Sequence, residues 1–318
     1  MKKIAILTSG GDAPGMNAAI RSVTRTALNK GMQVYGVSYG FKGLVENNIN
    51  EFDRFSVSEK IDKGGTFLRS ARYPEFLDVE VQKIAAQNLK DHGITSLIVI
   101  GGDGSFKGAE AISKFGIQVI GIPGTIDNDL NYTDYSIGFD TAVNTVVSAI
   151  DKLRDTSSSH QRCNIVEVMG RKCGDIAIHS AIATGSKYLA TPETGYSRDA
   201  LVMDLKRQFA EGIRYSIIVM TEHLDNPYDL AKHVEQQIGI ETRATILGHV
   251  QRGGAPSAFD RHLAVSLGRL AAELMADGVT NHIVGLKRGE LIHLPIAEGL
   301  SAPVKDRQHD IDTFLITK

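Results

Sequence analysis

The segment Leu97-Ile98-Val99-Ile100-Gly101-Gly102-Asp103-Gly104-Ser105 sets a short apolar run directly before a loop in which glycines surround one carboxylate. A short unbroken apolar run bounded by glycine is typical of a strand that is buried on both faces of a parallel sheet. The residues after this loop return to a helical pattern. The segment therefore predicts the strand, loop and helix of a βαβ unit.

The same rhythm recurs in two series along the chain. Apolar runs rich in Ile and Val, each followed by a polar or glycine loop and a helical pattern, lie at residues 4–7, 34–37, 97–100 and 119–122. A second series lies at residues 164–169, 187–190 and 215–221. The pattern predicts an α/β protein with two lobes, each a three-layer α/β/α arrangement around a largely parallel sheet.

The length of 318 residues exceeds the size at which a single hydrophobic core keeps growing, so two lobes with a cleft between them are expected. Apolar residues between the two series follow the i, i+3, i+4, i+7 spacing of an amphipathic helix: Phe139, Ala142, Val143, Val146, Val147, Ile150 and Leu153. This helix is expected to carry the chain from one lobe into the other.

Composition and charge exclude several classes of function. A formal net charge of −2 provides no general field for nucleic acid or an anionic membrane. Cys163 and Cys173 are too few for a disulfide framework and lack metal-ligand spacing, which favours structural roles in a reducing cytoplasm. The apolar run after Met1 ends too early for a signal peptide, and no later run reaches the length of a membrane helix. We therefore expect a cytoplasmic protein without nucleic-acid or membrane partners.

Two glycine loops follow predicted strands. Residues 8–17 read Thr-Ser-Gly-Gly-Asp-Ala-Pro-Gly-Met-Asn and open a helix, so backbone N–H groups and the helix dipole can face a phosphate. Their spacing fits neither G-x-G-x-x-G nor a P-loop, and an ordinary glycine turn explains this loop alone equally well. In the second loop, Asp103 is placed to reach a hydrated Mg²⁺, which needs only one or two carboxylates beside phosphate oxygens.

A third loop, Pro123-Gly124-Thr125-Ile126-Asp127-Asn128-Asp129, carries two carboxylates two residues apart. In an extended segment such residues point the same way, so Asp127 and Asp129 are expected to face one site. Neighbouring carboxylates raise each other's pKa, which suits a site where one acts as a base and the other meets a cation. A solvated acidic turn is the alternative interpretation.

Cations suited to a phosphorylated substrate appear in the second half of the chain. Arginine forks match phosphate geometry and stay charged, although any single one is more often a surface residue. Arg252 differs because two glycines follow it, and exposed backbone beside a fixed guanidinium makes an anion pocket. The candidates are Arg162, Arg171, Arg243, His249 and Arg252.

These residues together resemble those of the bacterial-type ATP-dependent 6-phosphofructokinases, and the resemblance extends over nearly all 318 residues. The similar motifs, in order, are residues 8–17, 64–68, 70–72, 101–105, 123–129, 169–171 and 247–254. A full set of motifs in the family's order is very specific.

The resemblance implies an enzyme, a phosphotransferase with an alcohol acceptor. Its expected reaction is transfer of a phosphoryl group from magnesium-ATP to the 1-hydroxyl of D-fructose 6-phosphate, the committed step of glycolysis. It further implies an ATP-binding lobe of residues 1–138 with 251–301 and a fructose 6-phosphate-binding lobe of residues 139–250 with 302–318. The expected assembly is a homotetramer whose active sites are shared between subunits.

Roles are implied residue by residue. Asp127 is expected as the general base, and Arg72 and Arg171, with Thr125, would act on the transferring phosphoryl group. ATP is expected at Gly11, Arg72, Tyr73, Gly102, Asp103, Gly104 and Ser105, with Asp103 at Mg²⁺. Fructose 6-phosphate is expected at Thr125, Ile126, Asp127, Met169, Gly170, Arg171, Glu222, His249, Val250, Gln251 and Arg252, with Arg162 and Arg243 from a neighbouring subunit.

The family's site for ADP or phosphoenolpyruvate as effector is only partly retained. Lys187 stands where an acid usually meets the effector's magnesium, and Glu211 and Ile213 replace lysines that would bind its phosphates. Fewer cations weaken anion binding, so we expect weak or altered regulation. The corresponding positions are Arg21, Ser22, Val23, Thr24, Arg25, Arg154, Gly185, Ser186, Lys187, Glu211, Ile213, Arg214 and Tyr215.

Other positions bear on the nucleotide. Relatives that use pyrophosphate carry Asp at Gly104 and Lys at Gly124, so the two glycines favour ATP. Leu77 stands where a basic residue is often found near ATP, and Phe41 is expected to offer an aromatic face near the adenine. The segment from Ala302 onward contains no interpretable motif.

Two other functions remain open from the residues alone. A kinase of the NAD or lipid type shares the Gly-Gly-Asp-Gly element but leaves the carboxylates of residues 123–129 and the Arg252 pocket unexplained. A sensor that binds nucleotide or sugar phosphate without turnover would not need Asp103, Asp127, Arg72 and Arg171 together.

Overall fold

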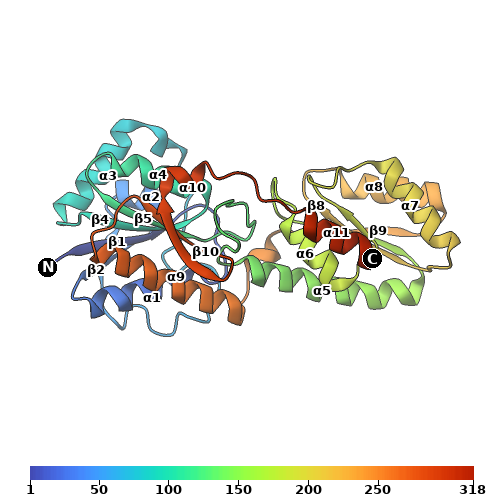
Figure 1. Cartoon of the computed structure of the whole chain (residues 1–318), viewed down its shortest axis with the longest axis horizontal. Helices are drawn as coiled ribbons and strands as arrows, with labels where there is room; N and C mark the ends of the chain where they lie inside the picture. The colour runs from blue at the N-terminus through green and yellow to red at the C-terminus, as the bar shows by residue number, and fades with distance from the viewer. The chain divides into compact units, whose positions relative to one another are not determined.

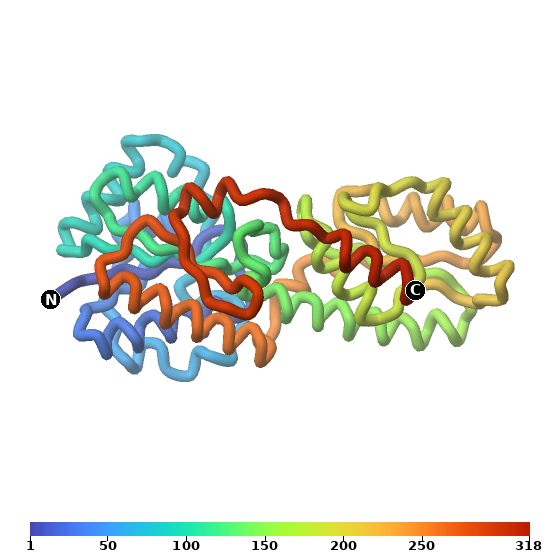
Figure 2. The backbone as a smooth tube through the Cα atoms, viewed as in Figure 1, coloured from blue at the N-terminus to red at the C-terminus, as the bar shows by residue number.

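The computed structural model describes residues 1–318 as two compact units. Unit 1 comprises Met1–Thr141 and Arg252–Val304, and unit 2 comprises Ala142–Gln251 and Lys305–Lys318. The chain therefore passes from one unit to the other at three points, after Thr141, after Gln251 and after Val304 (Figure 2). None of the helices is both long and apolar enough to cross a membrane.

Unit 1 is built on a sheet of 7 strands in the order β11-β10-β5-β4-β1-β2-β3. The neighbours β1 and β2, β1 and β4, β4 and β5, and β5 and β10 are parallel, and only the edge strands β3 and β11 are antiparallel to their neighbours. The strands are β1 (Lys3–Thr8), β2 (Gln33–Val37), β3 (Ile49–Phe52), β4 (Ser96–Gly101), β5 (Gln118–Pro123), β10 (His282–Lys287) and β11 (Glu290–Pro295).

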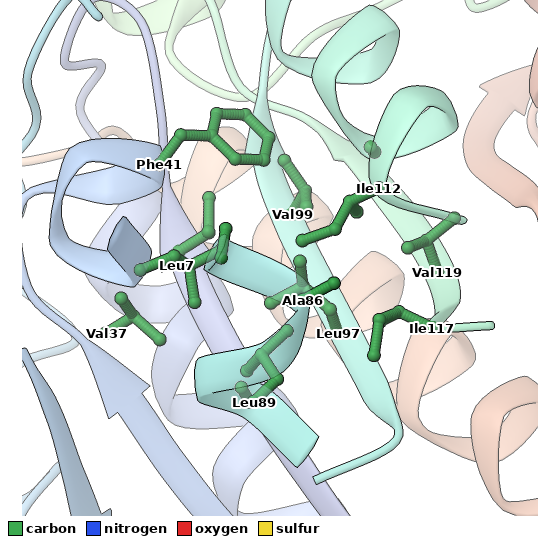
Figure 3. Close-up of a cluster of buried hydrophobic side chains, with 14 of the residues drawn as sticks. Leu7, Val37, Phe41, Ala86, Leu89, Leu97, Val99, Ile112, Ile117 and Val119 are labelled. Atoms are coloured by element: carbon green, nitrogen blue, oxygen red, sulfur yellow. The ribbon is translucent and has the colours of Figure 1, made fainter. Parts of the chain in front are cut away.

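Helices cover both faces of this sheet (Figure 1). On one face, α1 (Met16–Asn29) packs against α9 (Ala258–Ala276). On the other lie α2 (Gly40–Val45), α3 (Val79–Asp91), α4 (Asp103–Ser113) and α10 (Ile296–Leu300), with the 3₁₀ helix η1 (Pro74–Leu77) before α3. Figure 3 shows the core of this second face, where Leu7, Leu97 and Val99 of the strands meet Leu89 and Ile112 of the helices.

Unit 2 is built on a smaller sheet of 4 parallel strands in the order β7-β8-β6-β9. The strands are β6 (Cys163–Val168), β7 (Tyr188–Ala190), β8 (Ser216–Thr221) and β9 (Thr242–Ile246). On one face, α7 (Arg198–Ala210) and α8 (Pro227–Ile238) enclose an apolar core, and on the other α6 (Asp175–Thr184) carries α11 (Gln308–Thr317). The long helix α5 (Phe139–His160) and the 3₁₀ helix η2 (Gly248–Arg252) contain the first and second passages between the units.

The α/β fold class, with layered helices and largely parallel sheets, is confirmed. Each of the seven predicted strands is present within one residue at either end, and the predicted inter-lobe helix begins at Phe139. In unit 1 the chain order reverses beside β1, because β2 lies on one side of it and β4 on the other. Open parallel sheets bind ligands beyond the carboxyl ends of their strands at such a switch point, so a ligand is expected at the loops after β1 and β4.

Candidate functional site

Three loops meet at the switch point of unit 1. Ser9, after β1, donates its N–H to the Ile100 carbonyl at 3.0 Å, and Gly124, after β5, donates to the Gly101 carbonyl at 2.9 Å. A Cβ on Gly101 would lie 2.6 Å from the Ser9 carbonyl oxygen, so only glycine permits this approach. The structure thus brings together the three loops that the sequence singled out.

Residues 64–72 are fastened to the same place by side chains whose roles the sequence did not reveal. Asn17 accepts from the Phe67 N–H at 2.8 Å and donates to the Lys63 and Gly64 carbonyls at 3.1 Å. Ser70 Oγ donates to the Gly10 carbonyl at 2.6 Å. Of the predicted nucleotide residues, Arg72 is exposed and is the last residue of this anchored loop, and Tyr73, which is half-buried, follows it directly.

The acidic turn at the start of α4 fits a magnesium ion. Asp103 occupies the first helical position and its side chain is 43% exposed, with Oδ2 accepting from Lys107 Nζ at 2.7 Å. A Cβ on the adjacent Gly104 would meet no atom within 4 Å. One accessible carboxylate beside open space is the donor set that Mg²⁺ takes when phosphate oxygens complete its coordination.

The expectation that Asp127 and Asp129 face one site as alternate residues of an extended segment is wrong in its geometry. Asn128 adopts φ 53°, so the chain turns between the two carboxylates and the alternation of a strand does not apply. Asp127 is 4% exposed and its N–H donates to Thr125 Oγ1 at 3.2 Å, whereas Asp129 is half-buried. Ile126 is buried, so its side chain is not open to a ligand.

Arg252 lies against the first glycine loop. A Cβ on Gly11 would collide with the Arg252 guanidinium. A Cβ on Gly64 would likewise collide with the Gly254 carbonyl. The Nε of Arg252 is buried without a hydrogen-bond partner. A buried cationic nitrogen beside exposed backbone is suited to an anion, as the sequence predicted for Arg252.

In unit 2 the loop after β6 is held by two side chains that were expected at the substrate. Glu222 Oε1 accepts from the Arg171 N–H at 2.9 Å and the Gly170 N–H at 3.3 Å. Gln251 is fully buried, accepts from the Met169 N–H at 3.2 Å and donates to the Gly248 carbonyl at 2.9 Å. Gln251 therefore shapes the loop and does not offer its side chain to a ligand.

The other predicted substrate residues of unit 2 form two groups. His249 and Val250 are exposed on η2. Arg162 and Arg243 converge on Glu241, with nitrogen to oxygen distances of 3.6 Å and 2.6 Å. The hydrogen bond from Arg243 lowers the pKa of Glu241. Glu241 was missed because it lies on no motif and gains its role only from the pairing of β6 with β9.

The positions expected at an effector are distributed over both units. On α1, burial and then the positive charges of Arg25 and Arg54 lower the pKa of Arg21, which adds Arg54 to the predicted cluster. Val23 and Thr24 are fully buried on the same helix. Their side chains cannot contact an effector, because they pack inside unit 1.

In unit 2 the effector positions surround two turns. An Arg154 guanidinium nitrogen donates to the Thr184 carbonyl at the end of α6, just before Gly185 and the buried Ser186. Gln208 Nε2 donates to the Lys187 carbonyl at 3.2 Å, which joins this turn to the end of α7. The four remaining positions follow α7: Glu211, Ile213, Arg214 and Tyr215.

Two residues near the expected nucleotide behave differently from each other. Leu77 is 86% exposed at the end of η1. Phe41 is buried, and its ring stacks on Phe76 with centroids 4.3 Å apart while lying against Gly108. The expectation that Phe41 presents an open aromatic face is therefore wrong, because this ring belongs to the core of unit 1.

Comparison with known proteins supplies relatives over the whole chain. The family model described as Phosphofructokinase matches residues 3–275. The chain is 53% identical over 314 residues to the ATP-dependent 6-phosphofructokinase of Vibrio campbellii, covering 98% of each chain. It is 52% identical over 319 residues to the ATP-dependent 6-phosphofructokinase of Clostridium botulinum, covering 100% of this chain and 99% of the relative.

Solved structures of phosphofructokinases are also similar to this chain. Phosphofructokinase from Saccharomyces cerevisiae superposes with a TM-score of 0.87 at 34% identity, over 94% of this chain and 45% of that one. The chain thus spans less than half of the yeast chain. A pyrophosphate-dependent phosphofructokinase from Marinobacter aquaeolei superposes with a TM-score of 0.89 at 21% identity, over 99% and 91% of the two chains, which shows a shared fold.

Proposed function

We propose that this chain, which belongs to the phosphofructokinase family, transfers the γ-phosphoryl group of ATP to the 1-hydroxyl of D-fructose 6-phosphate. The products are ADP and D-fructose 1,6-bisphosphate, and the reaction is the committed step of glycolysis. The observation that carries this proposal is the meeting of the loops after β1, β4 and β5 around the buried Asp127 and the Gly11–Arg252 contact.

ATP binds at the switch point of unit 1. Gly11 and the turn of Gly102 to Ser105 present backbone N–H groups to its phosphates. Arg72, at the end of the anchored loop of residues 64–72, and the adjacent Tyr73 contact the nucleotide. Asp103 would hold Mg²⁺, which supplies neutralisation of the phosphate charge. Lys107 would then release or share the Asp103 carboxylate that it now contacts.

Asp127 acts as the general base and removes the proton from the 1-hydroxyl as its oxygen attacks the γ-phosphorus. Thr125 holds the backbone of Asp127 through the 3.2 Å hydrogen bond, so the carboxylate has a fixed position. Phosphoryl transfer needs positioning and charge stabilisation more than covalent participation by the protein. Arg72 and Arg171 provide that charge, since the planar guanidinium fork matches the geometry of phosphate oxygens.

The sugar phosphate is bound by Met169, Gly170, Arg171, Glu222, His249 and Arg252, with Arg162 and Arg243 contributed by a neighbouring subunit of a homotetramer. The convergence of Arg162 and Arg243 on Glu241 supports this role, because the carboxylate orients both forks toward one region. ADP or phosphoenolpyruvate would act weakly at the altered effector positions. The enzyme would operate in the cytoplasm.

ATP is the preferred donor over pyrophosphate. The open space around Gly104 supports this choice, because an aspartate there would fill the region that the nucleotide needs. Gly124 is tighter, since its Cβ would lie 3.0 Å from an Ile100 methyl and 3.1 Å from the Met16 methyl. A lysine at Gly124 would require these neighbours to shift.

The test is the rate of fructose 1,6-bisphosphate formation by the purified protein with magnesium-ATP and, separately, with magnesium-pyrophosphate. Turnover with ATP alone is expected. Turnover with pyrophosphate alone would overturn the choice of donor. An absence of product with both donors, in a protein that still binds ATP, would overturn the proposed reaction in favour of a sensor or of another kinase, which NAD and lipid acceptors would then distinguish.

A further inference from the structure

The returning segment Lys305–Lys318 carries a deeply buried cation. Arg307 is 8% exposed, although it lies in a stretch that contains no recognisable motif. A buried guanidinium is costly unless carboxylates and hydrogen-bond acceptors surround it, so its partners show what holds this segment in place.

Those partners come from the start of α6 and the loop before it, from the loop after β7 and from the returning segment itself. Arg307 Nε donates to Asp175 Oδ1 and lies 3.5 Å from Glu193 Oε1, and Nη2 donates to Cys173 Sγ at 3.0 Å. Nη1 donates to the Lys305 carbonyl at 3.1 Å. Burial raises the pKa of Cys173 to about 12, so its sulfur accepts this bond as a neutral thiol. Asp175 and Cys173 are themselves buried.

The same three side chains bear on the loop of residues 169–174, because Cys173 lies in it, Asp175 follows it and Glu193 is hydrogen-bonded to it. Cys173 donates its N–H to the Gly170 carbonyl at 2.9 Å, and Gly174 donates to Glu193 Oε1 at 2.9 Å. Gly170 adopts φ 143°, and a Cβ there would collide with the Cys173 carbonyl. Glu222 accepts from the Gly170 and Arg171 N–H groups. The loop is therefore clamped between Glu222 and the Arg307 cluster.

We propose that Arg307 is a positioning residue for the sugar-phosphate site. Through Asp175, Glu193 and Cys173 it fixes the backbone of the loop that presents Arg171. This inference rests on the proposed function insofar as it assigns fructose 6-phosphate to the loop. The anchoring of the loop by Arg307 does not depend on which substrate the loop binds.

The rest of the C-terminal segment has a different task. α11 packs on α6 through Ile311 and Phe314, which are buried, and Lys318 pairs with Asp204 at 3.3 Å. These contacts hold the helix to unit 2 without touching the loop. They provide a matched control, because Lys318 is a second C-terminal cation in an ion pair of the same unit.

The experiment compares Arg307→Met, Arg307→Lys and the control Lys318→Met. We expect Arg307→Met to lower kcat/KM for fructose 6-phosphate about tenfold or more through a raised KM, with the KM for ATP unchanged. Arg307→Lys keeps the positive charge but lacks the planar guanidinium, so we expect a smaller loss of kcat/KM for fructose 6-phosphate. A purely structural role would instead reduce the folded fraction, which lowers kcat and leaves both KM values as they were.

Amide hydrogen exchange of residues 169–174 tests the anchoring without activity. We expect faster exchange in both Arg307 variants than in the wild type and no change in Lys318→Met. Unchanged exchange in either folded Arg307 variant would overturn the anchoring. Faster exchange with an unchanged KM for fructose 6-phosphate would overturn the positioning role of Arg307 for the sugar-phosphate site. If the wild type does not phosphorylate fructose 6-phosphate at all, the proposed function fails while the exchange data still decide the anchoring.

Discussion

Asp127 is deeply buried in the loop after β5, which meets the loops after β1 and β4. Asp127 is 4% exposed. The hydrogen bond from its backbone N–H to Thr125 Oγ1 and the turn at Asn128 hold it in place. Its proposed task is removal of one proton in the transition state, and a general base of this kind contributes about 10²–10⁴-fold to the rate. Asp127→Ser is expected to lower kcat by about that factor while the dissociation constant for fructose 6-phosphate changes little.

Steady-state kinetics and calorimetric titration of fructose 6-phosphate measure the two quantities separately. Asp127→Asn is the matched control for volume, and it should lose as much rate as Asp127→Ser because an amide accepts no proton at neutral pH. Near-normal turnover in either variant would remove Asp127 from the role of base.

Asp260 is a second deeply buried carboxyl group, and it has no proposed catalytic role. It is fully buried in unit 1 and accepts from the Gly138 and Thr141 N–H groups at 2.8 Å. Burial raises its pKa from 3.8 to about 6, even though these hydrogen bonds oppose the shift. The folded protein therefore binds a proton that the unfolded chain has already released between pH 3.8 and about 6.

The stabilising contribution of Asp260 is fully present below pH 3.8 and is lost as the pH rises to about 6. A raised pKa of this size corresponds to about 3 kcal/mol of unfolding free energy across that window. Urea midpoints measured between pH 4 and pH 7 should therefore fall more steeply in the wild type than in Asp260→Asn, which cannot titrate. Parallel pH profiles for the two proteins would contradict this account.

At the scale of elements, the turns after α6 and α7 carry the positions where an effector is proposed to act. The hydrogen bond from Gln208 to the Lys187 carbonyl fixes the two turns beside each other, so the charges of Lys187 and Glu211 act in one region. A phosphate site with a carboxylate in place of a cation binds anions weakly. We expect a shallow ADP activation curve for the wild type and a steeper one for Glu211→Lys combined with Ile213→Lys.

Initial rates at subsaturating fructose 6-phosphate over a range of ADP concentrations give both curves. The variant Lys206→Met on α7 is a control for altered charge on the same helix. A strong ADP activation in the wild type, or an unchanged curve in the double variant, would show that these positions do not set the response.

Elements also show what the sequence could and could not predict. Seven of the eleven strands were predicted within one residue at either end, because each has a compact apolar run. Strands β3, β9, β10 and β11 were not predicted. Exposed residues interrupt β3, β9 and β11, so that they resemble polar loops, and Gly285 interrupts the apolar run of β10. The predicted and the unpredicted strands therefore differ in how continuously their residues are buried.

Side chains were harder to predict than strands where their partners lie far along the chain. Asp260 pairs with the start of α5, and Arg307 pairs with residues more than a hundred positions earlier, and no local spacing signals either contact. The extended geometry expected for residues 127–129 was wrong for a local reason, because Asn128 between the two aspartates adopts a left-handed conformation.

At the scale of the whole molecule, the proposed homotetramer completes each active site with Arg162 and Arg243 from a neighbour. If so, two inactive proteins can restore each other. Asp127→Ser lacks the base but keeps Arg162, and Arg162→Ala lacks the cation but keeps Asp127. Mixed tetramers formed by joint refolding are expected to regain activity in the sites that pair the intact Asp127 with the intact Arg162.

The fructose 1,6-bisphosphate formed by the refolded mixture is compared with that of each variant refolded alone. The double variant, mixed with itself, is the control. A mixture no more active than its components, in a protein that light scattering shows to be tetrameric, would place all the catalytic groups within one subunit.

The three passages of the chain between its units have a consequence for synthesis on the ribosome. The open edge of β5 pairs with β10, whose residues emerge only after all of β6, β7, β8 and β9. Until then the nascent sheet exposes a strand edge that invites pairing with other chains. Unit 2 likewise waits for its last fourteen residues, Lys305–Lys318, before Arg307 can reach the loop that it anchors. A ribosome that stalls before β10 therefore leaves both units unfinished.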